Sequence, residues 1–293
     1  MFREGLLQGK RILVTGGGTG LGKEMTEAYL SLGAELFICG RRKGVLDETA
    51  AELMDRRGGS VKTFGVDIRS AEAVDEMAGA IWADGGPLTG LVNNAAGNFI
   101  SPTKDLSTRG FDAIANIVLH GTFYVTHAVG RRWIADGVPG NVISILVTWV
   151  WNGSAFVVPS AMAKAGVHIM TRSLAAEWAP YGIRLNAIAP GSFPTKGATE
   201  RLRPEGLEDV YPAMESIPMG RAGRMDELRN LATFLMADGC EYLTGECIVI
   251  DGAAHLIGAG QFYHLSSLSE GDWETMRSAI RAADEKDRAR RSV

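Results

Sequence analysis

The chain has 293 residues, of which 46% are hydrophobic and 22% charged, so it can bury a large core and is not expected to be disordered. Thirty basic and 34 acidic residues give a net charge of −4, which lacks the basic surplus of a general nucleic-acid binder. The longest apolar run, residues 142–151, is too short to span a bilayer, and residues 1–10 lack the layout of a signal peptide. We therefore expect a cytoplasmic protein with no nucleic-acid partner and no membrane partner.

Short apolar runs rich in β-branched residues alternate with helical patterns along most of the chain. The predicted strands cover residues 11–15, 35–40, 61–67, 90–95, 141–146, 183–190 and 247–251. The predicted helices cover residues 22–32, 45–57, 71–82, 111–135, 160–179 and 225–237. Such alternation is typical of βαβ units, whose right-handed crossovers build a doubly wound parallel sheet. We therefore predict a seven-stranded, Rossmann-like α/β fold that forms a single domain over residues 1–293.

Two segments have no place in this sheet. Residues 191–224 contain four prolines and predict a mobile flap over the carboxyl edge of the sheet, where such folds bind ligands. Residues 262–293 form a C-terminal extension with one amphipathic stretch, residues 273–283, before a charged end.

The first predicted strand leads directly into TGGGTGLG at residues 15–22 and then into a helix. Gly16 lets the chain turn, while Gly20 and Gly22 let the backbone and the helix approach a pyrophosphate. The start of the helix adds N–H donors and the positive end of its dipole. Because a strand precedes the glycines and a helix follows them, we predict a dinucleotide site rather than a plain tight turn.

The segment after the second predicted strand indicates which dinucleotide binds. A carboxylate at this point would bind the ribose hydroxyls of NAD, but the chain has Arg41, Arg42 and Lys43. Arginine matches phosphate oxygens, so the pattern favours the 2′-phosphate of NADP, and we predict NADPH; a solvated basic turn is the alternative. Asp67 ends the third predicted strand and is either an acceptor for the adenine amino group or a turn former.

Four motifs resemble the short-chain dehydrogenase/reductase family over nearly the whole chain. They are TGGGTGLG, NNAAG at residues 93–97, the lysine in SAMAKAG at residues 160–166, and NAIAPG at residues 186–191. The resemblance implies cofactor contacts beyond the three glycines and the arginines. These contacts fall on Thr19, Leu21, Asn94, Ala95, Lys164, Pro190, Gly191, Phe193 and Thr195.

The chain departs from the ordinary member of that family, which reduces a carbonyl with a tyrosine four residues before the lysine. Counting back from Lys164, that position holds Ser160, and Val147 and Val118 stand where a serine and an asparagine would lie. Neither an unassisted serine nor a valine delivers a proton well to a carbonyl oxygen, so ordinary ketone reduction is disfavoured. Ser160 either contacts the cofactor or caps its helix. The lysine either orients the nicotinamide ribose or lies on the surface.

The pair of Ser160 and Lys164, NNAAGNFISPT at residues 93–103 and GDWETM at residues 271–276 resemble the 2,4-dienoyl-CoA reductase branch of the family. This resemblance covers roughly residues 8–285. It implies that a hydride from NADPH adds to the far end of a conjugated dienoyl thioester. Negative charge then moves to the thioester oxygen, and a carbon nearer the thioester is protonated.

The same resemblance implies the groups around the substrate. Asn98 is expected to hold the thioester oxygen, whereas Trp149 replaces a tyrosine of the mitochondrial type. Trp149 either donates its N–H to that oxygen or forms a wall of an apolar acyl pocket. The CoA moiety is expected near four residues. They are Arg69, Phe99, Ser107 and Arg201.

The resemblance also implies a homotetramer, in which the small-residue faces of helices 111–135 and 160–179 meet. The five histidines show no metal-binding spacing, so we expect no metal. Two other functions fit the sequence. One is a non-catalytic NADP-binding sensor or assembly protein, and the other is a reductase of a different enoyl or carbonyl substrate.

Overall fold

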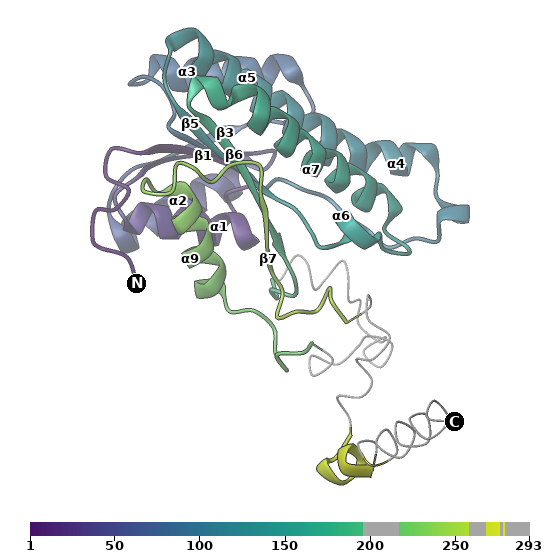
Figure 1. The fold of residues 1–293 in the computed structure, drawn as a ribbon. Coiled ribbons are helices and arrows are strands. Elements are labelled where there is room, and N and C mark those ends of the chain that lie inside the picture. Colours follow the sequence, from purple (N-terminus) through teal and green to yellow (C-terminus); the bar gives the residue numbers. More distant parts are fainter. Residues whose placement is uncertain (196–216, 258–267, 276–277, 279–293) are drawn as a thin grey trace. The chain divides into compact units, whose positions relative to one another are not determined.

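The computed structural model describes residues 1–195, 217–257, 268–275 and 278 (Figure 1). Residues Met1–Ala253 form one compact unit and residues Ala254–Val293 another. The first unit contains one parallel sheet with the strand order β3-β2-β1-β4-β5-β6-β7. The strands are β1 (Arg11–Thr15), β2 (Glu35–Gly40), β3 (Val61–Gly65), β4 (Gly90–Asn93), β5 (Gly140–Ile145), β6 (Ile183–Pro190) and β7 (Cys247–Ile250). The predicted Rossmann-like fold is confirmed, and the expected single domain over the full length stays a prediction.

Helices cover both faces of the sheet (Figure 1). They are α1 (Gly20–Ser31), α2 (Lys43–Arg57), α3 (Ala71–Ala83), α4 (Thr108–Ala115), α5 (Thr122–Asp136), α6 (Trp149–Asn152), α7 (Val158–Trp178) and α9 (Met225–Met236). One hydrophobic cluster joins α1, α2 and α9 to the sheet, and a second joins α3, α5 and α7. This division places the strands, which read as continuous apolar runs, between two helical layers.

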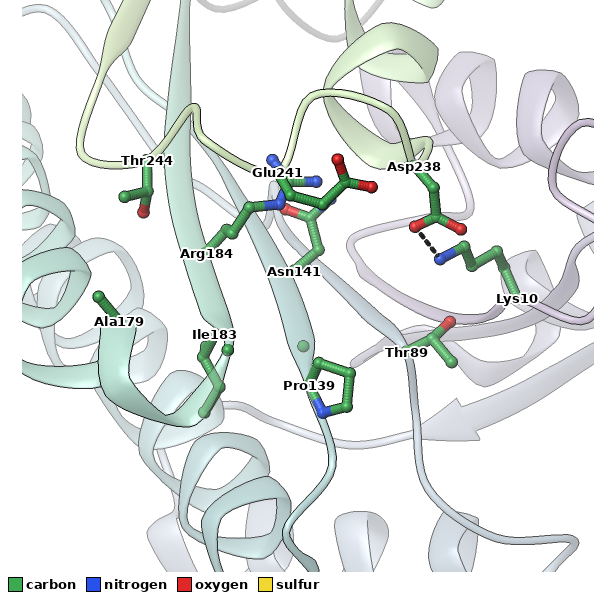
Figure 2. Close-up of a pocket in the computed structure, with 12 residues that line it drawn as sticks. Lys10, Thr89, Pro139, Asn141, Ala179, Ile183, Arg184, Asp238, Glu241 and Thr244 are labelled. Carbon is green, nitrogen blue, oxygen red and sulfur yellow. Dashed lines mark hydrogen bonds and ion pairs between the residues drawn. The ribbon is translucent and has the colours of Figure 1, made fainter.

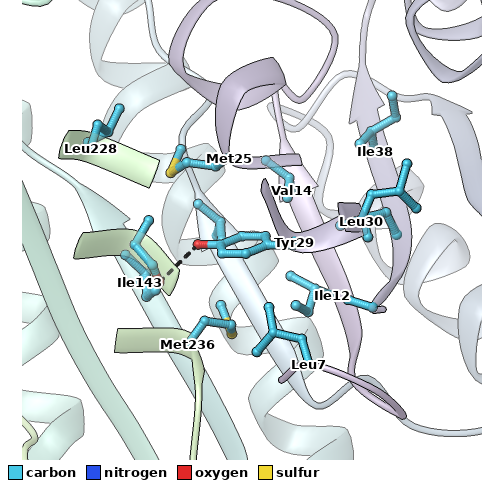
Figure 3. Close-up of a cluster of buried hydrophobic side chains, with 14 of the residues drawn as sticks. Leu7, Ile12, Val14, Met25, Tyr29, Leu30, Ile38, Ile143, Leu228 and Met236 are labelled. Carbon is cyan, nitrogen blue, oxygen red and sulfur yellow. Dashed lines mark hydrogen bonds between the residues drawn. The ribbon is translucent and has the colours of Figure 1, made fainter. Parts of the chain in front are cut away.

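Tyr29 shows how α1 is fixed to its layer. Its ring is fully buried, and its hydroxyl donates to the main-chain oxygen of Ala232 in α9 at 3.3 Å (Figure 3). Met25, Leu30 and Met236 belong to the same cluster (Figure 3). Since the bond satisfies a buried hydroxyl, it stabilises the contact between the two helices. The C-terminal half of α1 is thereby held against α9.

The structure differs from the predicted helices at three points. The predicted helix 111–135 is divided by a π-helical segment, Asn116–Gly121, between α4 and α5, and such segments are frequent near functional sites. Helix α6 was not predicted. Of the predicted amphipathic stretch 273–283, the described residues 273–275 and 278 are helical, and the helix begins earlier, at residue 270. Among the described residues, no helix is both long enough and apolar enough to cross a bilayer.

Candidate active site

The turn after β1 has the geometry of an anion site. Gly16 and Gly20 have φ values of +67° and +54°, which favour glycine. A Cβ at Gly22 would lie 2.3 Å from the Gly16 oxygen, so α1 starts too close to the turn for a side chain there. Thr19 precedes α1 without a side-chain capping bond, which leaves the first-turn N–H groups, including that of Leu21, for a phosphate. The predicted dinucleotide turn fits the pyrophosphate.

Thr15 and Asn94 fasten this turn to the adjacent strand β4. The chain leaves β1 and β4 toward opposite sides of the sheet, the arrangement that opens a crevice in such folds. Asn94 Nδ2 donates to the main-chain oxygens of Thr15 and Gly16 at 3.0 and 3.3 Å. The N–H groups of Asn94 and Ala95 both donate to Thr15 Oγ1 at 3.0 Å. Sequence reasoning missed Thr15, although a hydroxyl directly before the first glycine was a usable signal.

The three cations after β2 differ in the partners that they have among the described residues. Arg41 and Arg42 are exposed, and their side chains have no hydrogen bond or ion pair within the described residues. Lys43 differs, because its Nζ binds a carboxylate oxygen of Asp47 at 2.5 Å and Thr63 Oγ1 at 2.7 Å. The two arginines are therefore more available to a phosphate than Lys43, which already has two partners.

Asp67 and Arg69, which were predicted to bind different ligands, bind each other. A carboxylate oxygen of Asp67 accepts from Arg69 Nε at 2.9 Å and from Nη2 at 2.5 Å. The hydrogen bonds from Arg69 hold the pKa of Asp67 below its usual range, so the carboxylate is ionised. An adenine at Asp67 or a CoA phosphate at Arg69 has to share or displace this partner.

Asn98 follows β4, and its amide is oriented by the backbone of its own loop. The Asn98 Oδ1 accepts from the N–H of Phe99 at 2.9 Å. In the part of the chain that the structure describes, the Nδ2 group has no acceptor. Two N–H donors of Asn98 are therefore left for an external oxygen.

Lys164 lies inside the fold, so the interpretation as a surface lysine is wrong. Lys164 is only 7% exposed, and its Nζ donates to the main-chain oxygen of Ile145 at the end of β5. Burial lowers the pKa of Lys164 to about 8.

Ser160, one turn earlier, is also buried. It does not cap the helix, because α7 begins at Val158 with Val157 as its N-cap; its contact with a cofactor stays a prediction.

Trp149 begins α6 and is half-buried. Its main-chain oxygen accepts from the N–H of Gly153 at 2.9 Å, which closes this short helix. Helix α6 follows the end of β5, the same strand end that Lys164 contacts through Ile145. Both interpretations of Trp149 require it at this edge of the sheet, and it lies there.

Pro190 ends β6, and the chain then passes the glycine-rich turn. The N–H of Gly191 donates to the main-chain oxygen of Ile250 at 2.9 Å, which ties this exit to β7. A Cβ at Gly20 would lie 3.7 Å from the Thr195 side chain. The segment at residues 190–195, which is predicted to contact the cofactor, and the predicted pyrophosphate-binding turn are therefore neighbours.

The two ends of the predicted flap contact each other. The N–H of Gly223 donates to the main-chain oxygen of Ser192 at 2.9 Å, and a Cβ at Gly223 would lie 2.4 Å from the ring of Phe193. This ring is buried, and the contact of Phe193 with a cofactor stays a prediction. Residues 196–216, including Arg201, lie outside the described residues.

Phe99 and Ser107 also have structural partners. The ring of Phe99 packs on a cluster of Ile114, Val118 and Ala163, and Ala163 directly precedes the buried lysine. This contact brings the loop after β4 against α7. Ser107 caps α4, since its Oγ accepts a backbone N–H at 3.1 Å, and so a CoA contact would use its hydroxyl hydrogen.

A cavity of about 400 Å³ lies at the opposite edge of the sheet (Figure 2). Its lining includes Lys10, Gly140 and Ile183, which stand at the amino ends of β1, β5 and β6. Lys10 forms a 2.6 Å ion pair with Asp238 at its side (Figure 2). None of the predicted site residues lines this cavity, so it is not the candidate active site.

The carboxyl edge of the sheet instead brings together a turn that fits an anion, two arginines without an ion pair among the described residues, an oriented amide and a buried lysine. These features define a dinucleotide-binding α/β protein with polar groups for chemistry beside the cofactor crevice.

Comparisons with known proteins narrow this class. A family model described as Enoyl-(Acyl carrier protein) reductase matches residues 16–255. A Caenorhabditis elegans relative, named "Probable 2,4-dienoyl-CoA reductase 3", (3E)-enoyl-CoA-producing, is 40% identical over 98% of this chain and 94% of its own. A short chain dehydrogenase from Bacillus anthracis, solved by crystallography, is 39% identical, with a TM-score of 0.76 over 85% of this chain and 98% of that one. A gluconate 5-dehydrogenase from Burkholderia cenocepacia, solved with NADP and tartrate, is 28% identical, with a TM-score of 0.78 over 84% and 95%.

The chain belongs to the short-chain dehydrogenase/reductase family, as its motifs indicated. It is therefore an oxidoreductase, and the family uses a nicotinamide cofactor.

Proposed function

We propose that this protein is an NADPH-dependent reductase of 2,4-dienoyl-CoA thioesters that yields the 3-enoyl product. The observation that carries the proposal is the amide of Asn98, whose oxygen accepts the N–H of Phe99 and whose Nδ2 donors have no acceptor among the described residues. The name of the Caenorhabditis elegans relative agrees with this substrate. The protein is further proposed to act in the cytoplasm.

The proposed mechanism stabilises charge on the substrate rather than protonating a ketone. When bound, the nicotinamide supplies a hydride to the far end of the diene. Asn98 donates from Nδ2 to the thioester oxygen as negative charge gathers there. The Lys164 ammonium holds the ribose hydroxyls and adds a favourable field. The indole of Trp149 cannot release a proton at ordinary pH, so water supplies the one proton that the carbon next to the thioester takes up.

Turnover tests this proposal directly. Purified protein given NADPH and 2,4-hexadienoyl-CoA is expected to oxidise NADPH, which is followed by the loss of its absorbance. The expected product is a 3-enoyl-CoA, identified by mass spectrometry after derivatisation of the double bond. Tight NADPH binding with no turnover at any pH would instead favour a non-catalytic NADP-binding protein. Turnover of other enoyl or carbonyl compounds alone would favour the second alternative.

Trp149→Tyr is expected to raise kcat for dienoyl-CoA at least about 10-fold, because a phenol can both donate a hydrogen bond and relay a proton. Trp149→Phe is the matched control: it keeps an aromatic wall and removes the N–H. Unchanged kcat in both variants would show that Trp149 forms only a wall of the acyl pocket.

Arg41→Ala and Arg42→Ala are each expected to raise the KM for NADPH about 10-fold, and the KM for NADH by less than about 2-fold, since only NADPH carries a 2′-phosphate. Lys43→Ala is the control, because Asp47 and Thr63 already bind this lysine. Equal effects of the arginine variants on both cofactors would contradict the assignment of NADPH.

A homotetramer is proposed through the faces of α5 and α7. Phe123 on α5 and Met162 and Ile169 on α7 are large apolar side chains that are exposed in the single chain. Such side chains favour burial against a second copy.

A further inference from the structure

Phe156 lies in the loop between α6 and α7 with a φ of +64°. This left-handed conformation is unfavourable for a residue with a bulky side chain. Strained residues persist where the surrounding structure holds them, and they gather at ligand-binding sites. Gly153 in the same loop has a φ of +69°, so the loop uses glycine where only a turn is needed. Reversal of the chain direction therefore does not explain why a phenylalanine occupies this position.

The main chain of Phe156 holds the segment that carries Asn98. The N–H of Ser101 donates to the Phe156 oxygen at 2.9 Å. At the other end of this short segment, Asn98 Oδ1 accepts from the N–H of Phe99 at 2.9 Å. The Ser101–Phe156 bond therefore anchors the C-terminal end of residues 98–101 to another loop, and the strained residue supplies it.

The side chain of Phe156 takes no part in that bond, because only the backbone oxygen accepts it. Glycine at this position would supply the same oxygen without strain. The presence of phenylalanine despite the strain therefore indicates a role for its ring. That ring is 57% exposed. Ile100 and Trp151, on the two segments that the Ser101–Phe156 bond joins, are 46% and 48% exposed. Large exposed apolar side chains on adjoining segments are typical of a binding surface.

The chemistry of this surface favours hydrocarbon. The pantetheine arm of CoA has amide and hydroxyl groups that need polar partners when they are buried. Ile100, Trp151 and Phe156 offer an aliphatic chain and two aromatic rings, which suit the methylene groups of an acyl tail.

We propose that Phe156 is a specificity-determining residue whose ring covers the acyl tail beyond the diene, so that long chains bind better than short ones. This inference rests on the proposed function, because it places the thioester oxygen at Asn98. The left-handed backbone presents the ring to the tail, while its carbonyl keeps residues 98–101 in place for the oxyanion.

Chain length is the variable that tests this role. Phe156→Gly keeps the carbonyl and relieves the strain but removes the ring, and Phe156→Asn tolerates the left-handed φ with a polar side chain. In both variants, kcat/KM for 2,4-dodecadienoyl-CoA is expected to fall about 10-fold, and that for 2,4-hexadienoyl-CoA by less than about 2-fold. Phe156→Leu, which keeps an apolar side chain, is expected to recover most of the loss. Equal losses for both lengths, or no loss, would overturn the proposal.

Calorimetry separates this inference from the proposed function. Dodecanoyl-CoA and hexanoyl-CoA are titrated into the wild type and the Phe156→Gly variant without cofactor. The wild type is expected to bind the longer chain about 10-fold more tightly, and the glycine variant to lose that difference. This result would support the role of Phe156 even if no dienoyl-CoA were turned over. A wild type that binds both lengths equally, or neither, would contradict it.

Discussion

Asn98→Ala is expected to lower kcat for 2,4-dienoyl-CoA about 10²- to 10³-fold, the usual loss when one donor to an oxyanion is removed. The KM for the thioester is expected to change much less, because the charge on its oxygen develops only in the transition state. Steady-state kinetics with 2,4-hexadienoyl-CoA measure both constants, and a thermal melt checks that the fold survives.

Asn98→Asp is the matched comparison for this prediction. The aspartate keeps the size of the side chain and an oxygen that can accept the N–H of Phe99, as Oδ1 does at 2.9 Å. It replaces the two Nδ2 donors by a carboxylate oxygen, which repels a developing negative charge. We expect at least as large a loss of kcat as in Asn98→Ala. Retained activity in Asn98→Asp would show that Asn98 is not a donor to the substrate.

The inner strands were predictable because they are largely apolar segments buried between two helical layers, a pattern that length and residue type reveal. Strand β6, for example, covers Ile183–Pro190, as predicted. The π-helical segment Asn116–Gly121 was not predictable, because the apolar spacing continues through it. The short helix α6 was missed because four residues are too few to show a helical period.

The positions of the candidate site residues followed from motifs, but their pairings did not. Arg69 donates two N–H groups to the carboxylate of Asp67, two residues earlier in the chain. The residue types alone do not specify the local conformation that brings these two side chains together. The pair Lys43–Asp47 did have a signal, since the two residues are four apart in α2. The burial of Lys164 depends on how α7 packs against the sheet, mainly on β6, and so brings the lysine to the end of β5. No local pattern contains this tertiary contact.

The activity of the wild type is expected to fall as the pH rises through about 8. Burial lowers the pKa of Lys164 from 10.5 to about 8, so the free protein loses the ammonium above that pH. If the charged form binds the ribose and stabilises the oxyanion, kcat/KM falls about 10-fold for each further pH unit. Lys164→Arg, whose guanidinium stays charged, is expected to be less active but to show no such fall. A wild-type profile that stays flat from about pH 7 to about pH 9.5 would contradict this role.

The same lysine makes a prediction for stability that does not depend on any substrate. The pKa in the folded protein is about 8, below the ordinary 10.5, so between these values the unfolded chain binds a proton that the folded chain has released. The free energy of unfolding then rises with pH, by up to about 1.4 kcal/mol per pH unit from this one group.

Lys164→Met removes this contribution and keeps a long side chain in the same space. The free energy of unfolding in urea is measured for both proteins at about pH 8 and about pH 10. Titrating groups that the two proteins share contribute equally and drop out of the difference between them. The wild type is expected to gain stability relative to the methionine variant over this interval. A constant difference between the two proteins would mean that Lys164 keeps its ordinary pKa, and the predicted loss of activity above pH 8 would then need another titrating group.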